Sequence, residues 1–205
     1  MMAITKKILT QRSLNALDTK NTIFSTALHL FSQYGFDKVT VHDITKYAGV
    51  SKGTFYTHFE SKESVLVEQF QKIDNHYDQV FKKVSPQESA GNRLLILIGA
   101  LTDYCANVCG LAPLKVVYAS QISPSVSMKI LNNHNRSFYD LIRDIVSRGK
   151  ASGEFHIDME EDECVEFLAR SSRALIYDWC LYNGEMDLEK EGQRYFKIIL
   201  NYLNK

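Results

Sequence analysis

The sequence predicts an all-α protein, with a head of three short helices followed by a bundle of about five or six longer ones. Three observations predict this fold class. Apolar residues recur at helical spacing, no segment shows the alternation typical of a strand, and Gly, Pro, Ser and Asn divide the chain into helix-sized pieces. The 205 residues are 45% apolar, which is enough for a sizeable core.

The expected head opens with a helix that starts at Asp18 and ends before Gly35, a suitable C-cap. Its apolar positions fall at helical spacing: Ile23, Ala27, Leu30, Phe31 and Tyr34. Residues 1–17 show no sustained periodicity and are expected to form a flexible, basic arm. The basic side chains of that arm are Lys6, Lys7 and Arg12.

A short second helix is expected at 41–48, because Thr40 is a suitable N-cap and Asp43 occupies the matching position of a capping box. Gly49 then supplies the positive φ that a tight turn requires. Two short helices joined by such a turn, after a longer helix, form a helix-turn-helix, here at 40–59.

The third short helix is expected to run from its N-cap Ser51 to about His58, with Phe55 and Phe59 packing one face onto the head. The other side would expose small, polar, aromatic and basic groups: Lys52, Gly53, Thr54, Tyr56, Thr57 and His58. Such a face suits the major groove of DNA, where donors, acceptors and thymine methyls must be met closely. A three-helix scaffold without a DNA-binding role is the alternative interpretation.

Every segment beyond the head is expected to be helical. The expected helices are 62–84, 87–108, 112–121, 124–150, 159–183 and 188–204. The last two are apolar over wide arcs, which predicts that a second copy of the chain covers them. Burial in the chain's own core is the alternative.

The formal net charge of zero is unevenly distributed. Residues 1–62 contain eight Lys or Arg and four Asp or Glu, a net +4 that leaves −4 for the remainder. A basic head on an acidic body allows the head to approach phosphates while the body is repelled. Chance fluctuation of surface charge is the alternative.

Several classes of protein are not supported by the sequence. The most apolar stretch, 94–101, contains Gly99 and is soon followed by Asp103, so we expect no contact with a membrane and a cytoplasmic location. The four cysteines are then expected to be reduced structural thiols. No His pattern accompanies them, so neither a metal nor a cofactor is expected. Phosphate loops and the HExxH and GxSxG motifs are absent, which argues against an enzyme.

The segment around the helix-turn-helix resembles the signature of TetR/AcrR-family regulators. The matching stretches are TVHDI at 40–44, AGVSKGTFYTHF at 48–59 and ESKESVL at 60–66, within a resemblance that covers 18–67. Thr45 and Tyr47 depart from the usual residues of the motif. The resemblance implies a basic arm at 1–17, a DNA-binding domain at 17–77 and an effector-binding and dimerisation domain at 78–205.

The resemblance also implies the binding partners, which are a double-stranded DNA operator, a second copy of the chain and a small-molecule effector. It implies phosphate contacts by Thr40, Tyr56, His58 and Lys62. The residues expected to read bases are His42, Lys52, Gly53, Thr54 and Thr57. His42 is equally compatible with a solvated position, and Lys52 with a phosphate contact. A helical adaptor that has lost DNA binding is the alternative function, and the steep salt dependence of DNA binding would distinguish the two.

The effector is expected to be hydrophobic or aromatic and to bind within the bundle. The candidate lining residues are Tyr104, Cys105, Tyr118, His134, Phe138, Phe167, Tyr177 and Trp179. Simple core packing explains each of them as well. Arg170 and Arg173 flank the apolar stripe of their helix and are interpreted as a solvated or ion-paired face. Effector binding would change the spacing of the two recognition helices through helix 62–84 and release a repressor from its pseudo-palindromic operator.

Overall fold

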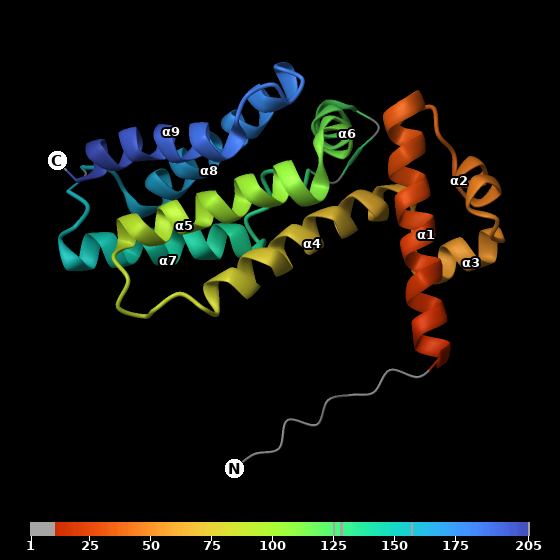
Figure 1. Cartoon of the computed structure of the whole chain (residues 1–205), viewed down its shortest axis with the longest axis horizontal. Coiled ribbons are helices and arrows are strands. Elements are labelled where there is room, and N and C mark those ends of the chain that lie inside the picture. The colour runs from red at the N-terminus through yellow and green to blue at the C-terminus, as the bar shows by residue number, and fades with distance from the viewer. Residues whose placement is uncertain (1–10, 125, 128, 157, 205) are drawn as a thin grey trace, which may run out of the picture. The chain divides into compact units, whose positions relative to one another are not determined.

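The computed structural model describes residues 11–124, 126–127, 129–156 and 158–204. Within these ranges every regular element is a helix, as the sequence predicts (Figure 1). The elements in chain order are α1 (Gln11–Tyr34), α2 (Val41–Ala48), α3 (Lys52–His58), α4 (Lys62–Phe81), α5 (Ala90–Asp103), the π-helix η1 (Tyr104–Cys109), α6 (Leu111–Ile122), α7 (Ser137–Ser152), α8 (Glu161–Leu181) and α9 (Leu188–Leu203).

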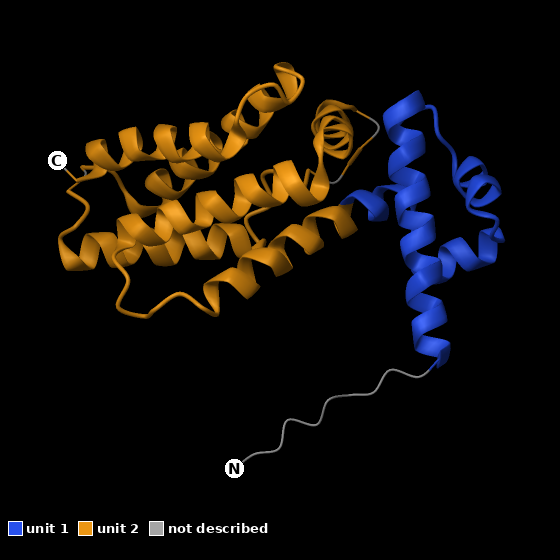
Figure 2. Cartoon of the chain, in the orientation of Figure 1, with its two compact units in different colours: residues 1–66 blue, residues 67–205 orange. Residues whose placement is uncertain are grey.

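The chain divides into two compact units, which comprise residues 1–66 and 67–205 (Figure 2). The division falls inside α4, and we call the two units the head and the body. In the head, α1, α2 and α3 surround a core of apolar side chains that are almost fully buried. This core includes Ile23, Ala27, Leu30, Phe31, Ile44, Phe55 and Phe59.

The first helix starts earlier than its periodicity predicts. Residues 11–17 belong to α1 rather than to an unstructured arm, and their side chains are exposed on every side of the helix. Because no face of this turn is buried, it carries no apolar periodicity that could reveal it. The expected arm residues Lys6 and Lys7 lie outside the described part of the chain, whereas Arg12 lies on α1.

In the body, α5 packs against α9 and α7, and α7 packs against α8. Gly192 allows α9 to approach α5 closely, since a Cβ atom at this position would lie 2.8 Å from Cγ2 of Thr102. The carboxylate of Glu154 accepts hydrogen bonds from the backbone N–H groups of Ala90 and Gly91, at 2.7 and 2.8 Å, and so satisfies the amino end of α5. These contacts fix the frame in which the cavities of the body lie.

The expected helix 124–150 is wrong in its first half, because α7 begins only at Ser137. The described residues between α6 and α7 form turns and irregular chain instead. Val126 and Ile130 are both buried and lie four residues apart, so the sequence shows helical spacing where the structure has no helix. The side-chain oxygen of Gln121 accepts hydrogen bonds from the backbone of Ile130 and Leu131, at 2.5 and 3.2 Å, and so replaces helical partners.

The four cysteines are unpaired, and their thiols are protonated at neutral pH. Burial raises the pKa of Cys105 well above its ordinary value, that of Cys109 to about 12, and those of Cys164 and Cys180 to about 11. Such thiols are poor nucleophiles.

No single helix among the described residues has the length and apolarity to cross a membrane, although one pair bent by 109°, Ala90–Cys109 with Leu111–Ile122, passes the test jointly. The described residues contain no group of three or more His, Cys, Asp or Glu that could hold a metal ion.

Candidate functional site

The helix-turn-helix is held in shape by local hydrogen bonds that the sequence predicts. At the start of α2, the Thr40 hydroxyl accepts from the N–H of Asp43 at 3.2 Å, and the Asp43 carboxylate accepts from the N–H of Thr40 at 2.9 Å. Ser51 accepts from the N–H of Thr54 at 3.0 Å and starts α3. Between the two helices Gly49 has a φ of 67°, the left-handed conformation expected for the turn.

The two faces of α3 differ as expected. Phe55 is fully buried and Phe59 nearly so, which fixes the inner face against the head. The remaining residues of α3 are exposed or half-buried, including Tyr56 with 55% of its surface exposed. They are Lys52, Gly53, Thr54, Tyr56, Thr57 and His58. The structure therefore places six of the nine expected DNA-contacting residues on the part of a short helix that Phe55 and Phe59 leave unburied.

Gly53 is not required by the fold. A Cβ atom here would meet only the hydroxyl oxygen of Ser51, at an ordinary contact distance of 3.6 Å, and Gly53 is not among the glycines with positive φ. Glycine lowers the stability of a helix relative to alanine. An exposed glycine that neither packing nor φ explains is consistent with a backbone that must approach another molecule closely.

The remaining candidates lie on α2 and at the start of α4. His42 is exposed on α2, and Thr40 is exposed at its N-cap, where the Thr40 hydroxyl also donates to Asp43 at 2.6 Å. Lys62 differs from expectation, because its ammonium group donates to the backbone carbonyls of Phe36 at 2.8 Å and Val39 at 3.1 Å. It also lies 4.4 Å from the centre of the Phe36 ring. Its ammonium group thus binds the turn between α1 and α2 instead of facing a free phosphate site.

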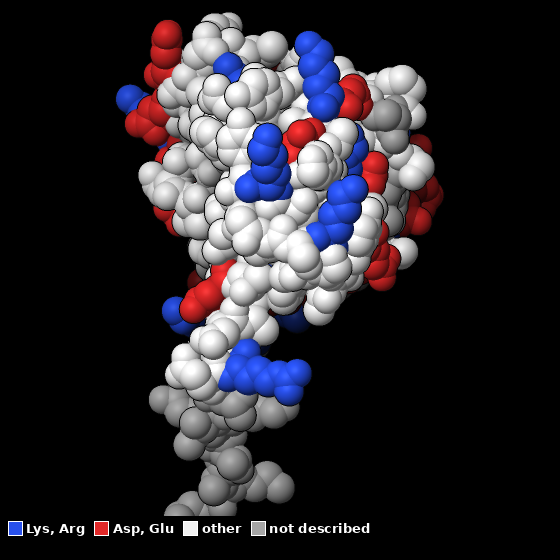
Figure 3. All heavy atoms as spheres, turned by 90° about the vertical axis from the view of Figure 1, so that its right-hand side faces the viewer, with Lys and Arg blue, Asp and Glu red and all other residues white. Residues whose placement is uncertain are grey.

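Charge is mixed on the one face of the molecule that Figure 3 draws. Figure 3 shows Lys and Arg side chains spread over one face among uncharged groups, with Asp and Glu between and around them. This view shows no continuous basic patch. Recognition by such a surface depends on individually placed donors more than on a strong overall field.

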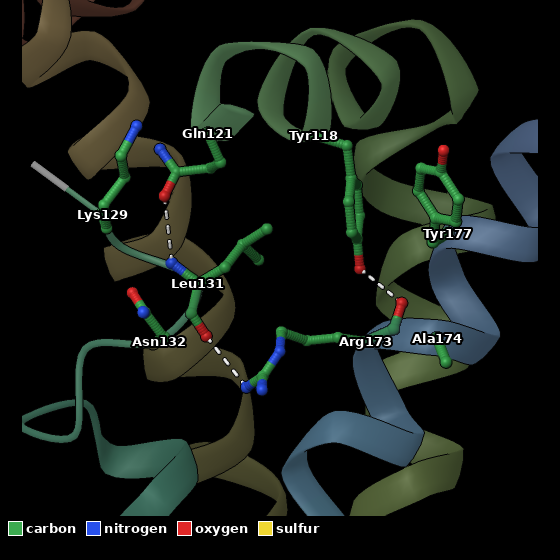
Figure 4. Close-up of a pocket in the computed structure, with 8 residues that line it drawn as sticks. All are labelled: Tyr118, Gln121, Lys129, Leu131, Asn132, Arg173, Ala174 and Tyr177. Carbon is green, nitrogen blue, oxygen red and sulfur yellow. Dashed lines mark hydrogen bonds between the residues drawn. The ribbon is translucent and has the colours of Figure 1, made fainter. Parts of the chain in front are cut away.

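The body contains a small apolar cavity of about 60 Å³. Its lining comes from α4, α5, η1, α6, α7 and α8 and from the segment before α7, and it includes Phe70, Ile73, Tyr77, Leu101, Cys105, Leu114, Val117, Tyr118, Leu131, Arg136, Phe138, Ser172, Arg173 and Ile176. A wider, open pocket of about 420 Å³ adjoins it. Three residues line both spaces, namely Tyr118, Leu131 and Arg173 (Figure 4).

Of the expected effector-lining residues, four lie at these spaces. Tyr118, Phe138 and Cys105 line the inner cavity, and Tyr118 and Tyr177 line the open pocket. The others have different surroundings. Tyr104 packs on His76, and Nε2 of His134 lies 2.7 Å from a carboxylate oxygen of Glu166. Phe167 is exposed on α8, and Trp179 donates to the carbonyl of Met186 at 3.1 Å.

Sequence reasoning missed the two arginines of the cavity. Arg136 forms a bidentate ion pair with Asp74, at 2.7 and 3.0 Å, and lies over the ring of Phe70. The interpretation of Arg173 as a solvated or ion-paired residue is wrong, since its guanidinium is half-buried and donates to the carbonyl of Leu131 at 3.2 Å and the hydroxyl of Tyr139 at 2.6 Å. No sequence signal marked Arg136, and the place of Arg173 beside the apolar stripe did not reveal its role, because the partners of both residues lie 34 or more positions away in the chain.

An all-helical chain with an exposed third helix in its head and an apolar cavity in its body has the arrangement expected of a ligand-responsive DNA-binding regulator. Residues 23–68 match the family described as bacterial regulatory proteins, tetR family. The matched segment covers the helix-turn-helix of the head, so the head is similar to the proteins of this family.

Relatives and solved structures agree with this assignment. The chain is 25% identical over 189 residues to the HTH-type transcriptional repressor KstR2 of Mycolicibacterium smegmatis, with 88% of each chain covered. In fold it is similar to the fatty acid degradation regulator FadR of Bacillus halodurans (TM-score 0.74, 21% identity, 89% of this chain and 94% of that chain). It is also similar to FadR of Bacillus subtilis in complex with stearoyl-CoA (TM-score 0.70, 18% identity, 89% and 98% covered).

Proposed function

We propose that this chain is a homodimeric transcriptional repressor that binds a pseudo-palindromic DNA operator and is released by a small hydrophobic effector. The observation that carries the proposal is the exposed face of α3, held by two N-caps and the Gly49 turn within the segment that matches the family. Residues 17–77 are assigned to DNA binding and 78–205 to effector binding and dimerisation.

On this proposal, phosphate contacts set the register of the head on DNA and base contacts provide specificity. Thr40, Tyr56 and His58 are assigned to phosphates. The residues assigned to base edges are His42, Lys52, Gly53, Thr54 and Thr57. One head contacts few base pairs, so affinity and specificity require a second copy related by a two-fold axis.

The effector is assigned to the body because the cavity there has an apolar lining. A relative of the same fold solved with stearoyl-CoA supports the same chemical class. The effector acts by binding one of two states of the dimer more tightly than the other, and a coupling of about 1–3 kcal/mol is typical of such regulators. Helix α4 connects the two units along the chain and is the route by which such a change can reach the head.

The experiment that tests the proposal is the recovery of DNA fragments by the purified full-length chain from sheared genomic DNA of its source organism. We expect wild-type protein to enrich a shared inverted repeat and the double variant Tyr56→Ala, His58→Ala to enrich none. A matched control, Tyr34→Ala with His29→Ala, removes the same two residue types from exposed positions on α1 and is expected to behave as wild type. If wild-type protein at low salt enriches no sequence, the proposed function is wrong.

A further inference from the structure

Arg173 lies where the apolar cavity meets the open pocket. It comes from α8, and it lines both spaces together with Tyr118 of α6 and Leu131 of the segment before α7 (Figure 4). A molecule that occupies the open pocket and extends into the cavity must therefore pass the Arg173 side chain. The positive charge of Arg173 therefore influences which molecules can bind in the two spaces.

Among the described residues, no carboxylate forms a hydrogen bond or an ion pair with Arg173. Its hydrogen-bond acceptors, the Leu131 carbonyl and the Tyr139 hydroxyl, are both neutral. By contrast, the other arginine of the cavity, Arg136, is neutralised by the carboxylate of Asp74. Within the described residues, no Asp or Glu forms an ion pair with Arg173, and neither lining contains an acidic side chain. A half-buried cation without a counter-charge is costly unless an anion joins it.

The guanidinium has hydrogen-bond donors available for such an anion. Both of its bonds within the described chain use Nη1, so Nε and Nη2 remain on the opposite edge of the group. Two parallel N–H groups on one edge match the two oxygens of a carboxylate or phosphate. Lys129 also lines the open pocket, and its ammonium adds a second positive charge while donating to the carbonyl of Ser123 at 3.0 Å.

We infer that Arg173 is the anion-binding residue of an amphipathic effector, whose carboxylate or phosphate group binds the guanidinium. The apolar part of this effector lies in the open pocket of about 420 Å³ and extends into the smaller cavity beside Phe138 and Ile176. The inference rests on the proposed function and narrows its effector from hydrophobic molecules in general to anionic ones. It predicts that a neutral molecule with the same apolar part binds more weakly.

Three probes test the inference by direct binding to the full-length chain. These probes are the fluorescent fatty acid cis-parinaric acid, its neutral methyl ester, and stearoyl-CoA, whose anionic groups are phosphates. We expect wild-type protein to bind at least one anionic probe more tightly than the ester, and Arg173→Gln to weaken that binding by about tenfold or more. If Arg173→Gln weakens the binding of parinarate, the anionic group of the effector is assigned as a carboxylate. If it weakens the binding of stearoyl-CoA alone, that group is assigned as a phosphate.

Matched variants separate charge from structure. Arg170→Gln removes an exposed arginine from the same helix, where it pairs with Glu166 at 3.3 Å, and is expected to leave probe affinity unchanged. Tyr139→Phe removes the hydrogen bond to Arg173 but keeps the cation, so anionic probes should still bind. Arg173→Lys keeps a positive charge and serves if Arg173→Gln does not fold.

Three outcomes would overturn the inference. In the first, wild-type protein binds parinarate and its methyl ester equally well and does not bind stearoyl-CoA. In the second, wild-type protein binds neither anionic probe. In the third, Arg173→Gln binds the anionic probes as tightly as wild-type protein does. Operator binding by the same proteins without any probe distinguishes the two failures. If the proteins bind the operator but probe affinity does not depend on Arg173, only the inference fails. If wild-type protein does not bind the operator, the proposed function fails.

Discussion

The ammonium group of Lys62 is surrounded by backbone carbonyls at the turn between α1 and α2. It donates to Phe36 and Val39, with Asp37 at 3.5 Å, and it lies over the Phe36 ring. An ammonium group has three donors, and these carbonyls occupy them. The side chain therefore stabilises the head by joining the first turn of α4 to the chain that leads into α2.

The Lys62→Met variant should lower both the stability of the head and its affinity for operator DNA, but it should leave the salt dependence of binding unchanged. Each phosphate contact contributes about 0.9 to the slope of log affinity against log salt concentration. By comparison, loss of a lysine that binds a phosphate lowers the slope by about 1. A drop of that size in Lys62→Met would mean that its ammonium group binds phosphate.

Gly53 offers a test in which stability and function change in opposite directions. An alanine here meets no close neighbour and replaces a poor helix former, so Gly53→Ala should raise the stability of the head by up to about 1 kcal/mol. If α3 approaches DNA through this position, the added methyl group should weaken operator binding at the same time. Thermal unfolding and titration with the recovered operator measure both effects. A more stable variant with unchanged operator affinity would remove Gly53 from the interface.

At the scale of single helices, α2 depends on an ionised cap. Hydrogen bonds from the hydroxyl and then the N–H of Thr40 hold the pKa of the Asp43 carboxyl below its ordinary value of 3.8. A carboxyl whose pKa is lower in the folded state stabilises the fold above its ordinary pKa, and this stabilisation is lost as pH falls through the lowered value.

Asp43→Ala should therefore lower the melting temperature at pH 7, and its difference from wild type should shrink as pH falls below 3.8. Asp18→Ala removes an exposed carboxylate within α1, away from any N-cap, and is the control. Melting curves followed by circular dichroism from pH 7 to pH 3 are sufficient. A difference that stays constant over this range would show that the charge of Asp43 plays no part.

The ion pair between Asp74 and Arg136 joins α4 to the segment before α7. Both side chains are mostly buried, with 17% and 11% of their surfaces exposed. Removal of one partner leaves the other without its counter-charge, so Asp74→Asn and Arg136→Gln should each cost about 1–3 kcal/mol, between the values for exposed and fully buried pairs. The double variant should cost clearly less than the sum of the two.

A double-mutant cycle on urea unfolding measures this coupling. The pair Arg194 and Glu191, three residues apart on α9 with 67% and 28% of their side chains exposed, provides a comparison cycle in which we expect a much smaller coupling. Additive costs for Asp74 and Arg136 would show that the pair does not join the two segments energetically.

An element can be predicted from the sequence when the residues that stabilise it are close to it in the chain. The caps Thr40 and Ser51 and the turn at Gly49 act on residues at most five positions away, so they are predictable from sequence. The segment before α7 is not, because its backbone is bonded by Gln121 and Arg173 from other helices. Periodicity also misreads Val126 and Ile130, which are buried at helical spacing in a segment that is not helical.

At the scale of the whole molecule, the apolar surface of the body remains to be explained. Large apolar side chains are exposed on α8 and α9, whereas monomeric proteins rarely leave large contiguous apolar areas uncovered. On α8, Phe167 and Leu181 lie fourteen residues apart and so share a face. On α9, Ile198 and Tyr202 are each 57% exposed and lie four residues apart, also on one face. A second copy of the chain is the proposed cover for both helices.

Ile198→Asp should convert the dimer into a monomer, because it would place a carboxylate in an apolar interface without a partner. Operator affinity should fall with it, since a single head retains only half of the contacts. Light scattering on the eluted protein gives the mass, and operator titration gives the affinity. Val108→Asp is the control, because Val108 is 62% exposed on η1 and lies outside both helices. A monomeric wild type, or an Ile198→Asp variant that remains dimeric, would place the interface elsewhere or remove it.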